Sequence, residues 1–173
     1  MALPKMRSLR DSSQETVLAG VLVGEEGVVL EQVEGLHSFS FRVNPGLRFP
    51  LHTAAPGKIF LSQLEPKRRT SMLGKLKLAK FTSKTIISKE GLEEEIQKVL
   101  DLGYAIDYEE EIKGQACIGA PVFGRNAKLA GSIWLVAPTS RLPKKKVPDV
   151  ASMVMKSADE ISLALGNQFL RVA

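Results

Sequence analysis

The side chains of His52, Asp107 and Cys117 are of the types that a thiol hydrolase combines as base, orienting carboxylate and nucleophile. A reactive thiolate needs a cationic neighbour or a helix N-terminus close by, whereas Cys117 lies within the apolar segment 115–123. Free cysteine in such a segment usually behaves as a small buried hydrophobic residue. We therefore expect no catalytic residues and no enzyme activity, with a thiol enzyme using Cys117 as an alternative.

Metal and nucleotide chemistry have less support in the sequence. The chain has two widely separated histidines and one cysteine, which provide no metal-ligand spacing. The acidic run at 109–111 alternates between faces, so we interpret it as a solvated strand end. No GxGxxG, GxxxxGK(S/T) or GxSxG pattern occurs. We expect neither a metal site nor a cofactor.

The segment RFPLHTAAPGKIF, residues 48–60, combines a short apolar strand with an unusual helix start. Pro56 is tolerated only in a first helical turn, and Gly57 permits close approach of another group. The segment predicts a helix N-terminus that is approached either by another part of the backbone or by a ligand.

The elements that position these residues follow from hydrophobic periodicity and turn signals. Helices are expected at about 1–12, 55–63, 65–76, 89–102 and 148–170, with Ser88 and Gly103 capping the fourth. Strands are expected at 16–23, 28–34, 38–43, 104–110, 115–123 and 128–137, with 81–87 extended. This order predicts one α/β (α+β) domain whose central sheet has about six strands, is predominantly antiparallel and has helices on both faces.

Strand alternation predicts which side chains face inward. In 104–110, Asp107 shares a face with Ala105, and in 115–123, Cys117 shares a face with Gln115 and Gly119. If Asp107 faces inward, its carboxylate needs a hydrogen-bond donor from the protein or from a ligand.

The composition is that of a globular domain. The chain has 173 residues, of which 44% are hydrophobic and 25% charged, and its longest nearly uncharged apolar stretch, 129–138, is too short to span a membrane. Nothing near the N-terminus resembles a signal peptide and the lone cysteine agrees with a reducing compartment, so we expect a cytoplasmic protein. The net charge is +5, but the basic residues form three modest groups without interleaved aromatics. We interpret these groups as solvated faces.

Several motifs, taken in order, carry a resemblance to a known family. They are RFPLHTAAPGKIFLSQL, KFTSKTIIS, LGYAIDYEE, GQACIGAPVF and a strand ending in AP before a last amphipathic helix. From about residue 10 to about residue 166, the chain resembles the effector-binding domain of IclR-type bacterial transcriptional regulators. The resemblance implies a GAF-like fold, ligand sensing without catalysis, and association into homodimers or tetramers. It also implies that DNA is contacted only through a separate winged helix-turn-helix module.

The resemblance implies a division of the chain as well. Residues 1–12 correspond to the end of a linker helix and residues 13–173 to the effector-binding domain. No winged helix-turn-helix pattern is found in this chain. We expect either a part of a longer regulator or a sensor without a DNA-binding module of its own.

The ligand-binding positions are implied by the same motifs. Asp107 and Cys117 match family pocket positions, and Phe41 lies on a strand that contributes to the pocket wall. The ligand-facing loop, whose backbone N–H groups hold the effector's carboxylate in the family, matches Thr53, Ala54, Ala55, Pro56 and Gly57. Ala55 and Gly57 are expected to leave room for the ligand.

Two departures from the family pattern bear on the ligand. Pro56 has no N–H to donate, and Trp134 and Val136 stand where small hydroxylated residues serve members that bind short 2-oxo acids. We therefore expect a larger, partly apolar organic acid or an aromatic or sugar-derived catabolite. In the alternative, Trp134 fills the pocket and the domain is a ligand-free oligomerisation module.

Overall fold

The computed structural model describes residues 1–168. The helices are α1 (Ala2–Ser13), α2 (Ala55–Ser62), α3 (Pro66–Lys75), α4 (Lys89–Leu102) and α5 (Val147–Ala164), with the short 3-10 turns η1 (Arg125–Ala127) and η2 (Lys144–Lys146). The strands are β1 (Thr16–Val23), β2 (Glu26–Val33), β3 (Arg48–Phe49), β4 (Ala105–Tyr108), β5 (Gln115–Phe123) and β6 (Leu129–Pro138).

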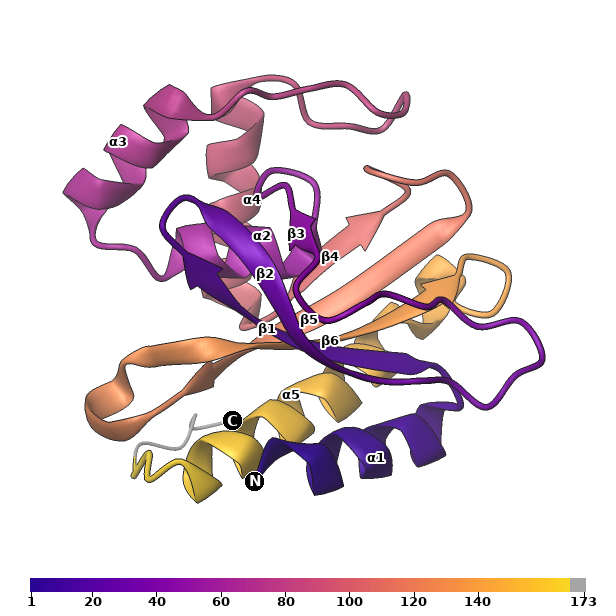
Figure 1. Cartoon of the computed structure of the whole chain (residues 1–173). Coiled ribbons are helices and arrows are strands. Elements are labelled where there is room, and N and C mark those ends of the chain that lie inside the picture. The colour runs from indigo at the N-terminus through magenta and orange to yellow at the C-terminus, as the bar shows by residue number, and fades with distance from the viewer. Residues whose placement is uncertain (169–173) are drawn as a thin grey trace.

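The six strands form one curled sheet in the order β3-β2-β1-β6-β5-β4, and every neighbouring pair is antiparallel (Figure 1). β1 and β2 form one hairpin, and β5 and β6 form another. The two hairpins are joined by the pairing of β1 with β6, so the first and last strands of the chain lie side by side at the centre of the sheet. The α+β fold with a predominantly antiparallel sheet of about six strands is therefore confirmed.

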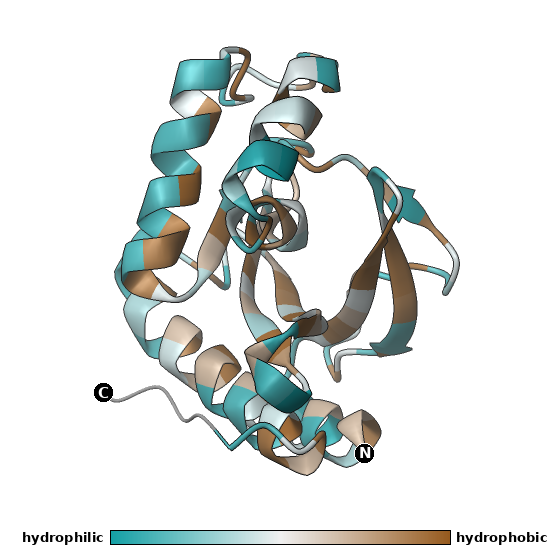
Figure 2. Cartoon of the chain, turned by 90° about the vertical axis from the view of Figure 1, so that its left-hand side faces the viewer, coloured by the Kyte–Doolittle hydropathy of each residue, from teal (hydrophilic) through white to brown (hydrophobic). Residues whose placement is uncertain are grey.

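Helices cover both faces of the sheet, as expected from the two-sided burial of the central strands. α1 and α5 lie on one face, while α2, α3 and α4 lie on the other (Figure 1). Figure 2 shows that the strands are mostly hydrophobic and that hydrophilic residues lie on the outer sides of the helices. Each face thus has its own apolar core, and alternate residues of a strand belong to different cores.

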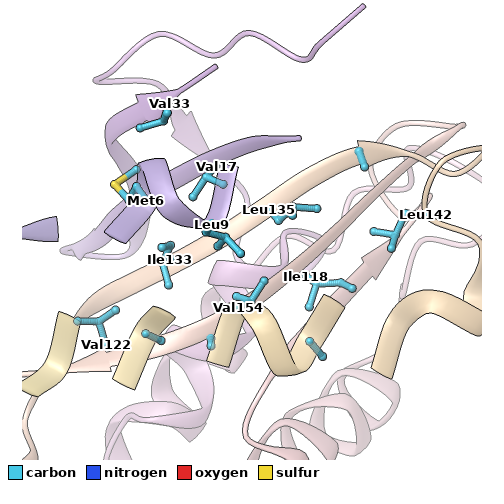
Figure 3. Close-up of a cluster of buried hydrophobic side chains, with 14 of the residues drawn as sticks. Met6, Leu9, Val17, Val33, Ile118, Val122, Ile133, Leu135, Leu142 and Val154 are labelled. Carbon is cyan, nitrogen blue, oxygen red and sulfur yellow. The ribbon is translucent and has the colours of Figure 1, made fainter. Parts of the chain in front are cut away.

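The residues predicted as the end of a linker helix pack into the first of these cores. Met6 and Leu9 of α1 are buried there with Val17 and Ile133 from the strands and Val154 from α5 (Figure 3). α1 is therefore part of the packed structure around the sheet.

The predicted caps of α4 are confirmed. The Ser88 hydroxyl accepts a hydrogen bond from the Gly91 N–H at 3.1 Å, which satisfies one of the free donors of the first turn. Gly103 takes a left-handed conformation with φ 78°, and its N–H bonds the carbonyl of Val99.

The predicted strand at 38–43 is wrong. The expected alternation is present, because Phe41 and Val43 both point toward the cavity. The backbone of this segment, however, is bonded by side chains and not by the backbone of a neighbouring strand. The Thr16 hydroxyl donates to the Phe41 carbonyl at 2.8 Å, and the Val43 N–H donates to the Gln32 side chain at 2.5 Å. A hydrophobic alternation does not distinguish these side-chain bonds from a strand pairing.

Two further boundaries differ from expectation. Residues 81–87, expected to be extended, belong to no strand and contain a turn at residues 83–84. The last helix ends at Ala164 rather than about residue 170, since Gly166 follows with φ 87°, a conformation that stops a helix. The predicted residues 169–170 lie outside the described part of the chain.

Candidate functional site

Two rows of side chains cross the sheet on its α2 face. Asp107 on β4 pairs with Cys117 on β5, and Cys117 pairs with Val136 on β6. In the neighbouring row, Gly119 pairs with Trp134, which pairs with Leu18 on β1. Since residues two apart on a strand share a face, both rows lie under the start of α2.

The start of α2 lies over these rows. Ala54 is the N-cap in an extended conformation, and Pro56 occupies the first turn as predicted. Every residue of α2 is buried. A Cβ on Gly57 would lie 2.5 Å from the Leu51 Cα and 2.5 Å from its carbonyl oxygen. The sequence left open whether a backbone or a ligand approaches this glycine, and the structure places the backbone of Leu51 there.

A cavity of about 120 Å³ lies between the rows and the helix start. Its lining consists of Leu18, Val29, Phe41, Val43, Leu47, Phe49, Ala54, Ala55, Pro56, Asp107, Glu111, Ile112, Gln115, Cys117, Trp134 and Val136. Eight of the ten sequence-predicted positions are in this set. Thr53 and Gly57 are not, and the sequence reasoning missed the apolar residues that β1, β2, β3 and the following segments supply.

Asp107 is the most deeply buried carboxyl group on the lining, with 1% of its surface exposed. Its Oδ1 accepts a hydrogen bond from the Glu110 N–H at 2.8 Å, and its Oδ2 has no hydrogen bond within residues 1–168. Burial raises the pKa of Asp107 from 3.8 to about 7, against the opposing effect of the Glu110 N–H. The donor that an inward Asp107 requires is thus supplied by the protein for one oxygen only.

The interpretation of 109–111 as a solvated strand end is wrong. β4 stops at Tyr108, and Glu109 has φ 63°, which breaks the alternation. Glu110 is 9% exposed, and Glu111 lines the cavity while accepting a hydrogen bond from Thr53 at 3.2 Å. Burial raises the pKa of both Glu110 and Glu111. Thr53 therefore orients a lining residue without lining the cavity itself.

A buried lysine, which the sequence reasoning missed, holds α2 against β4. Lys58 is 0% exposed, and its Nζ donates to the Ile106 carbonyl at 2.8 Å and to Glu110 Oε1 at 2.5 Å. The charge of Glu95 on α4 lies 3.9 Å away. Glu110 Oε2 is buried without a hydrogen bond among the described residues. The sequence contained one signal for this buried ion pair, namely a single lysine within the apolar segment 55–62.

The FTSKT segment fixes the acidic loop from the other side. The Thr82 hydroxyl donates to the Glu109 carbonyl at 2.6 Å, and the Thr85 hydroxyl donates to the Glu110 carbonyl at 2.6 Å. Lys84 forms an ion pair with the Glu109 carboxylate. The motifs at 81–87 and 104–110, which lie apart in the sequence, thus form one structural unit beside the cavity.

The thiol chemistry considered from residue types is not supported by the geometry. The His52 ring bonds the Ala79 carbonyl at 2.9 Å and stacks on Phe81. Burial, together with the charge of Asp107, raises the pKa of the Cys117 thiol well above its ordinary value. A thiol of raised pKa is a poor source of the nucleophilic thiolate.

Trp134 reduces the cavity without filling it. Its ring packs edge-on against Phe49 with centroids 5.5 Å apart, and a Cβ on Gly20 would lie 2.9 Å from its Cη2. A Cβ on Gly119 would lie 3.1 Å from Ile59 Cδ1 and 3.2 Å from the Trp134 Cβ, so Gly20 makes room for the indole and Gly119 for the base of that side chain. The indole N–H donates no hydrogen bond to any described residue.

The described residues, 1–168, contain neither a cluster of metal ligands nor a helix suited to span a membrane. No group of three or more His, Cys, Asp and Glu side chains in this range is arranged to hold a metal ion. No helix in the same range has the length and apolar character needed to cross a membrane.

Comparison with known proteins identifies the family. The family described as bacterial transcriptional regulator IclR C-terminal matches residues 1–163. The chain is 32% identical over 165 residues to the transcriptional repressor IclR of Escherichia coli, covering 94% of this chain and 60% of that protein. It is 30% identical over 164 residues to the regulator BhcR of Paracoccus denitrificans, covering 95% of this chain and 59% of that protein. The chain therefore spans about three fifths of the length of these relatives.

Solved structures of the family have the same fold. The IclR structure of Thermotoga maritima superposes with a TM-score of 0.90 at 28% identity, covering 95% of this chain and 67% of that one. The C-terminal domain of the Escherichia coli regulator KdgR superposes with a TM-score of 0.85 at 27% identity, covering 95% of this chain and 96% of that one. These relatives are transcriptional regulators and not enzymes, which agrees with the expectation of no enzyme activity. The chain belongs to the IclR family of bacterial transcriptional regulators and corresponds to the C-terminal domain of its members.

Proposed function

We propose that this domain senses a small effector that binds in the cavity between α2 and the sheet. The observation that carries the proposal is the position of Asp107, a buried carboxyl with one unbonded oxygen on the wall of a mostly apolar cavity. An unpaired polar group in such a place costs free energy unless a ligand or water pairs with it. Phe41, Ala54, Ala55, Pro56, Cys117, Trp134 and Val136 provide the surrounding contacts, and Thr53 and Gly57 position the helix start and Glu111 around them.

Among the effector classes considered from the sequence, the lining favours an aromatic catabolite over a sugar-derived one. Phe41, Phe49 and Trp134 present rings to the cavity, whereas a sugar needs several hydroxyl partners. The polar side chains on the lining are Asp107, Glu111 and Gln115, with the thiol of Cys117 beside them.

Occupancy of the cavity is transmitted through the arrangement of a homodimer or tetramer to the DNA-binding modules of the whole regulator. Such coupling between sites is typically worth about 1 to 3 kcal/mol, which changes operator affinity severalfold to about a hundredfold. A dimeric helix-turn-helix protein reads half-site spacing, so a change in subunit arrangement suffices. Because its target is bacterial DNA, we assign the regulator to the cytoplasm.

A thermal-shift screen tests the proposal with organic acids, single-ring aromatic compounds and sugar acids as probes. At about one hundred times the dissociation constant, a ligand stabilises the folded state by about 2.7 kcal/mol. For a domain of this size, we therefore expect a hit to raise the Tm by about 5 to 10 °C.

The variant Asp107→Asn should abolish most of that shift, since it changes the cavity's unbonded carboxylate while keeping an acceptor for the Glu110 N–H. The control Asp101→Asn changes an exposed carboxylate on α4 and should leave the shift unchanged. A broad panel without a hit, or hits that ignore Asp107→Asn, would contradict the sensing proposal and favour a ligand-free oligomerisation module. Sedimentation velocity with and without a hit tests the transmission step, which requires a changed assembly.

A further inference from the structure

The segment that carries Phe41 into the cavity wall is held in place by side chains. Among the described residues, the backbone of 38–43 takes part in no backbone–backbone hydrogen bond. The Phe41 carbonyl accepts a hydrogen bond from the Thr16 hydroxyl at 2.8 Å. The Phe39 carbonyl accepts one from Arg141 Nη2 at 3.1 Å. This part of the wall therefore depends on individual side-chain bonds and not on a strand ladder.

The two donors, Thr16 and Arg141, are both anchored where α1 ends and β1 begins. Thr16 is the first residue of β1 and is 0% exposed, and its hydroxyl also accepts a hydrogen bond from the Gly35 N–H at 3.0 Å. Arg141 makes two hydrogen bonds to the carboxylate of Glu15, of which the one from Nη2 to Oε2 measures 2.8 Å. Glu15 and Thr16 thus connect the cavity wall with the junction of α1 and β1.

The C-terminal end of α1 makes further bonds to the same stretch of chain. Gln14 ends the helix with φ 64°, and its carbonyl accepts a hydrogen bond from the Leu36 N–H at 2.9 Å. Arg10, in the last turn of α1, donates to the Glu34 carbonyl at 3.2 Å. One helix end and the segment 34–41 are therefore joined at several points.

The bonds of Glu15 and Thr16 resist displacement because these polar groups are buried. Glu15 is 6% exposed, and a buried carboxylate that loses its cation is strongly destabilising. The two parallel bonds of an arginine to a carboxylate fix orientation as well as distance. A buried hydroxyl that loses its acceptor likewise costs free energy. Moving the cavity wall therefore favours movement of the helix end with it over breaking these bonds.

Resting on the sensing function proposed above, we propose that Glu15, Thr16 and Arg141 are positioning residues that join the cavity wall at Phe41 to the C-terminal end of α1. An effector that contacts Phe41 then changes the freedom of this helix end through these bonds. Because α1 corresponds to the predicted end of a linker helix, the link leads from the cavity toward the DNA-binding modules of the whole regulator. Coupling of this kind requires an element whose equilibrium both sites bias, and the segment 34–41 is that element.

Amide hydrogen exchange without any ligand tests this inference, with Phe41→Ala as the perturbation at the cavity wall. We expect the Gln14 and Leu36 amides to exchange about fivefold faster in Phe41→Ala than in the parent, because the wall segment opens more often. In the background Thr16→Val, Arg141→Lys, which lacks the hydroxyl and the forked guanidinium, adding Phe41→Ala should change these rates by less than about twofold. A role confined to stability would leave the effect of Phe41→Ala the same in both backgrounds.

Two matched controls separate the link from general loosening. Ile112→Ala shortens another side chain on the cavity lining, and should leave the Gln14 and Leu36 amides unchanged. Ser162→Ala removes a buried hydroxyl that bonds only Ala158 and Phe123, so the effect of Phe41→Ala should persist in that background.

The outcomes separate this inference from the proposed function. Unchanged Gln14 and Leu36 amides in Phe41→Ala, or an equal acceleration in the Thr16→Val, Arg141→Lys background, would overturn the inference and leave the sensing function standing. The sensing function depends on the thermal-shift screen, since no ligand enters the exchange experiment. Melting temperatures show which variants are folded. If the double background is not, Thr16→Val and Arg141→Lys alone should each reduce the effect of Phe41→Ala, and a full effect in both would overturn the inference.

Discussion

At the scale of single residues, Lys58 places a charged group in the buried space between α2 and β4. Its ammonium is 0% exposed and has Glu110 Oε1 at 2.5 Å as its main partner. A buried ion pair adds little net stability over a well-packed apolar pair, but removing one partner leaves the other charge uncompensated. Lys58 therefore acts as a constraint that fixes α2 over β4.

We predict that Lys58→Met destabilises the domain by about 3 to 5 kcal/mol, because Glu110 and the Ile106 carbonyl lose their shared donor. The double variant Lys58→Met, Glu110→Leu should recover most of the loss. The matched control Lys98→Met breaks an exposed pair with Glu95 and should cost less than about 1 kcal/mol. Urea denaturation measures all three. A cost below about 1 kcal/mol for Lys58→Met would show that the pair does not anchor the helix.

The sequence predicted the candidate site unevenly at this scale. Alternation was sufficient to place Asp107 and Cys117 on the α2 face, because a strand imposes a period of two. The same rule failed at Glu110 and Glu111, where the positive φ of Glu109 ends the alternation. Lys58 was missed because its partners come from β4 and the loop after it, and a local pattern contains no information about them.

At the scale of elements, the position of α2 depends on a backbone contact at Gly57. Leu51 lies where a Cβ of residue 57 would be, so a larger residue has to push α2 away from the segment that precedes it. That displacement would also move Ala55 and Pro56, which line the cavity.

Gly57→Ala should therefore destabilise the domain by about 1 to 3 kcal/mol or more through overpacking. The matched control is Gly74→Ala in α3, where an added Cβ has no atom within 4 Å. That substitution should stabilise the domain by about 0.5 to 1 kcal/mol, as expected for alanine replacing glycine within a helix. Thermal unfolding of the two variants tests the pair. A Gly57→Ala variant as stable as the parent would rule out the close packing against Leu51.

The elements themselves were largely predictable, because periodicity, caps and turns are local signals. The boundaries of β1, α2 and α4 agree with expectation to within about two residues, as such signals allow. The strand expected at 38–43 failed because Thr16 and Gln32 bond its backbone in place of a neighbouring strand. The residues that β1, β2 and β3 contribute to the cavity depend on how the sheet curls, which local patterns do not specify.

At the scale of the whole molecule, three carboxyl groups beside the cavity share a direction of pKa shift. Burial raises the pKa values of Asp107, Glu110 and Glu111, so the folded state binds more protons than the unfolded state above about pH 4. Their contribution to stability is then fully present at low pH and is lost as the pH rises through the folded-state values. The lowered pKa of Glu109 acts in the opposite direction, below the ordinary glutamate range.

We predict that the free energy of unfolding falls between pH 5 and pH 8. With a folded-state pKa of about 7, Asp107 alone contributes about 2 to 3 kcal/mol of this fall, since one pKa unit corresponds to about 1.4 kcal/mol. Asp107→Asn should therefore flatten the profile by that amount. Denaturant titrations of both proteins at the two pH values measure the difference. Equal slopes for parent and variant would show that Asp107 does not titrate in this range.

The alternation of β5 and β6 has a consequence for how the domain could signal. Cys117 and Trp134 face the cavity, while their chain neighbours Ile118 and Ile133 belong to the core that buries Met6 of α1. β5 and β6 thus separate the cavity from the α1 core, and one layer of side chains lies on each side of these two strands. A displacement of these two strands would therefore reach Met6 and α1 through direct side-chain packing, without any helix having to unfold.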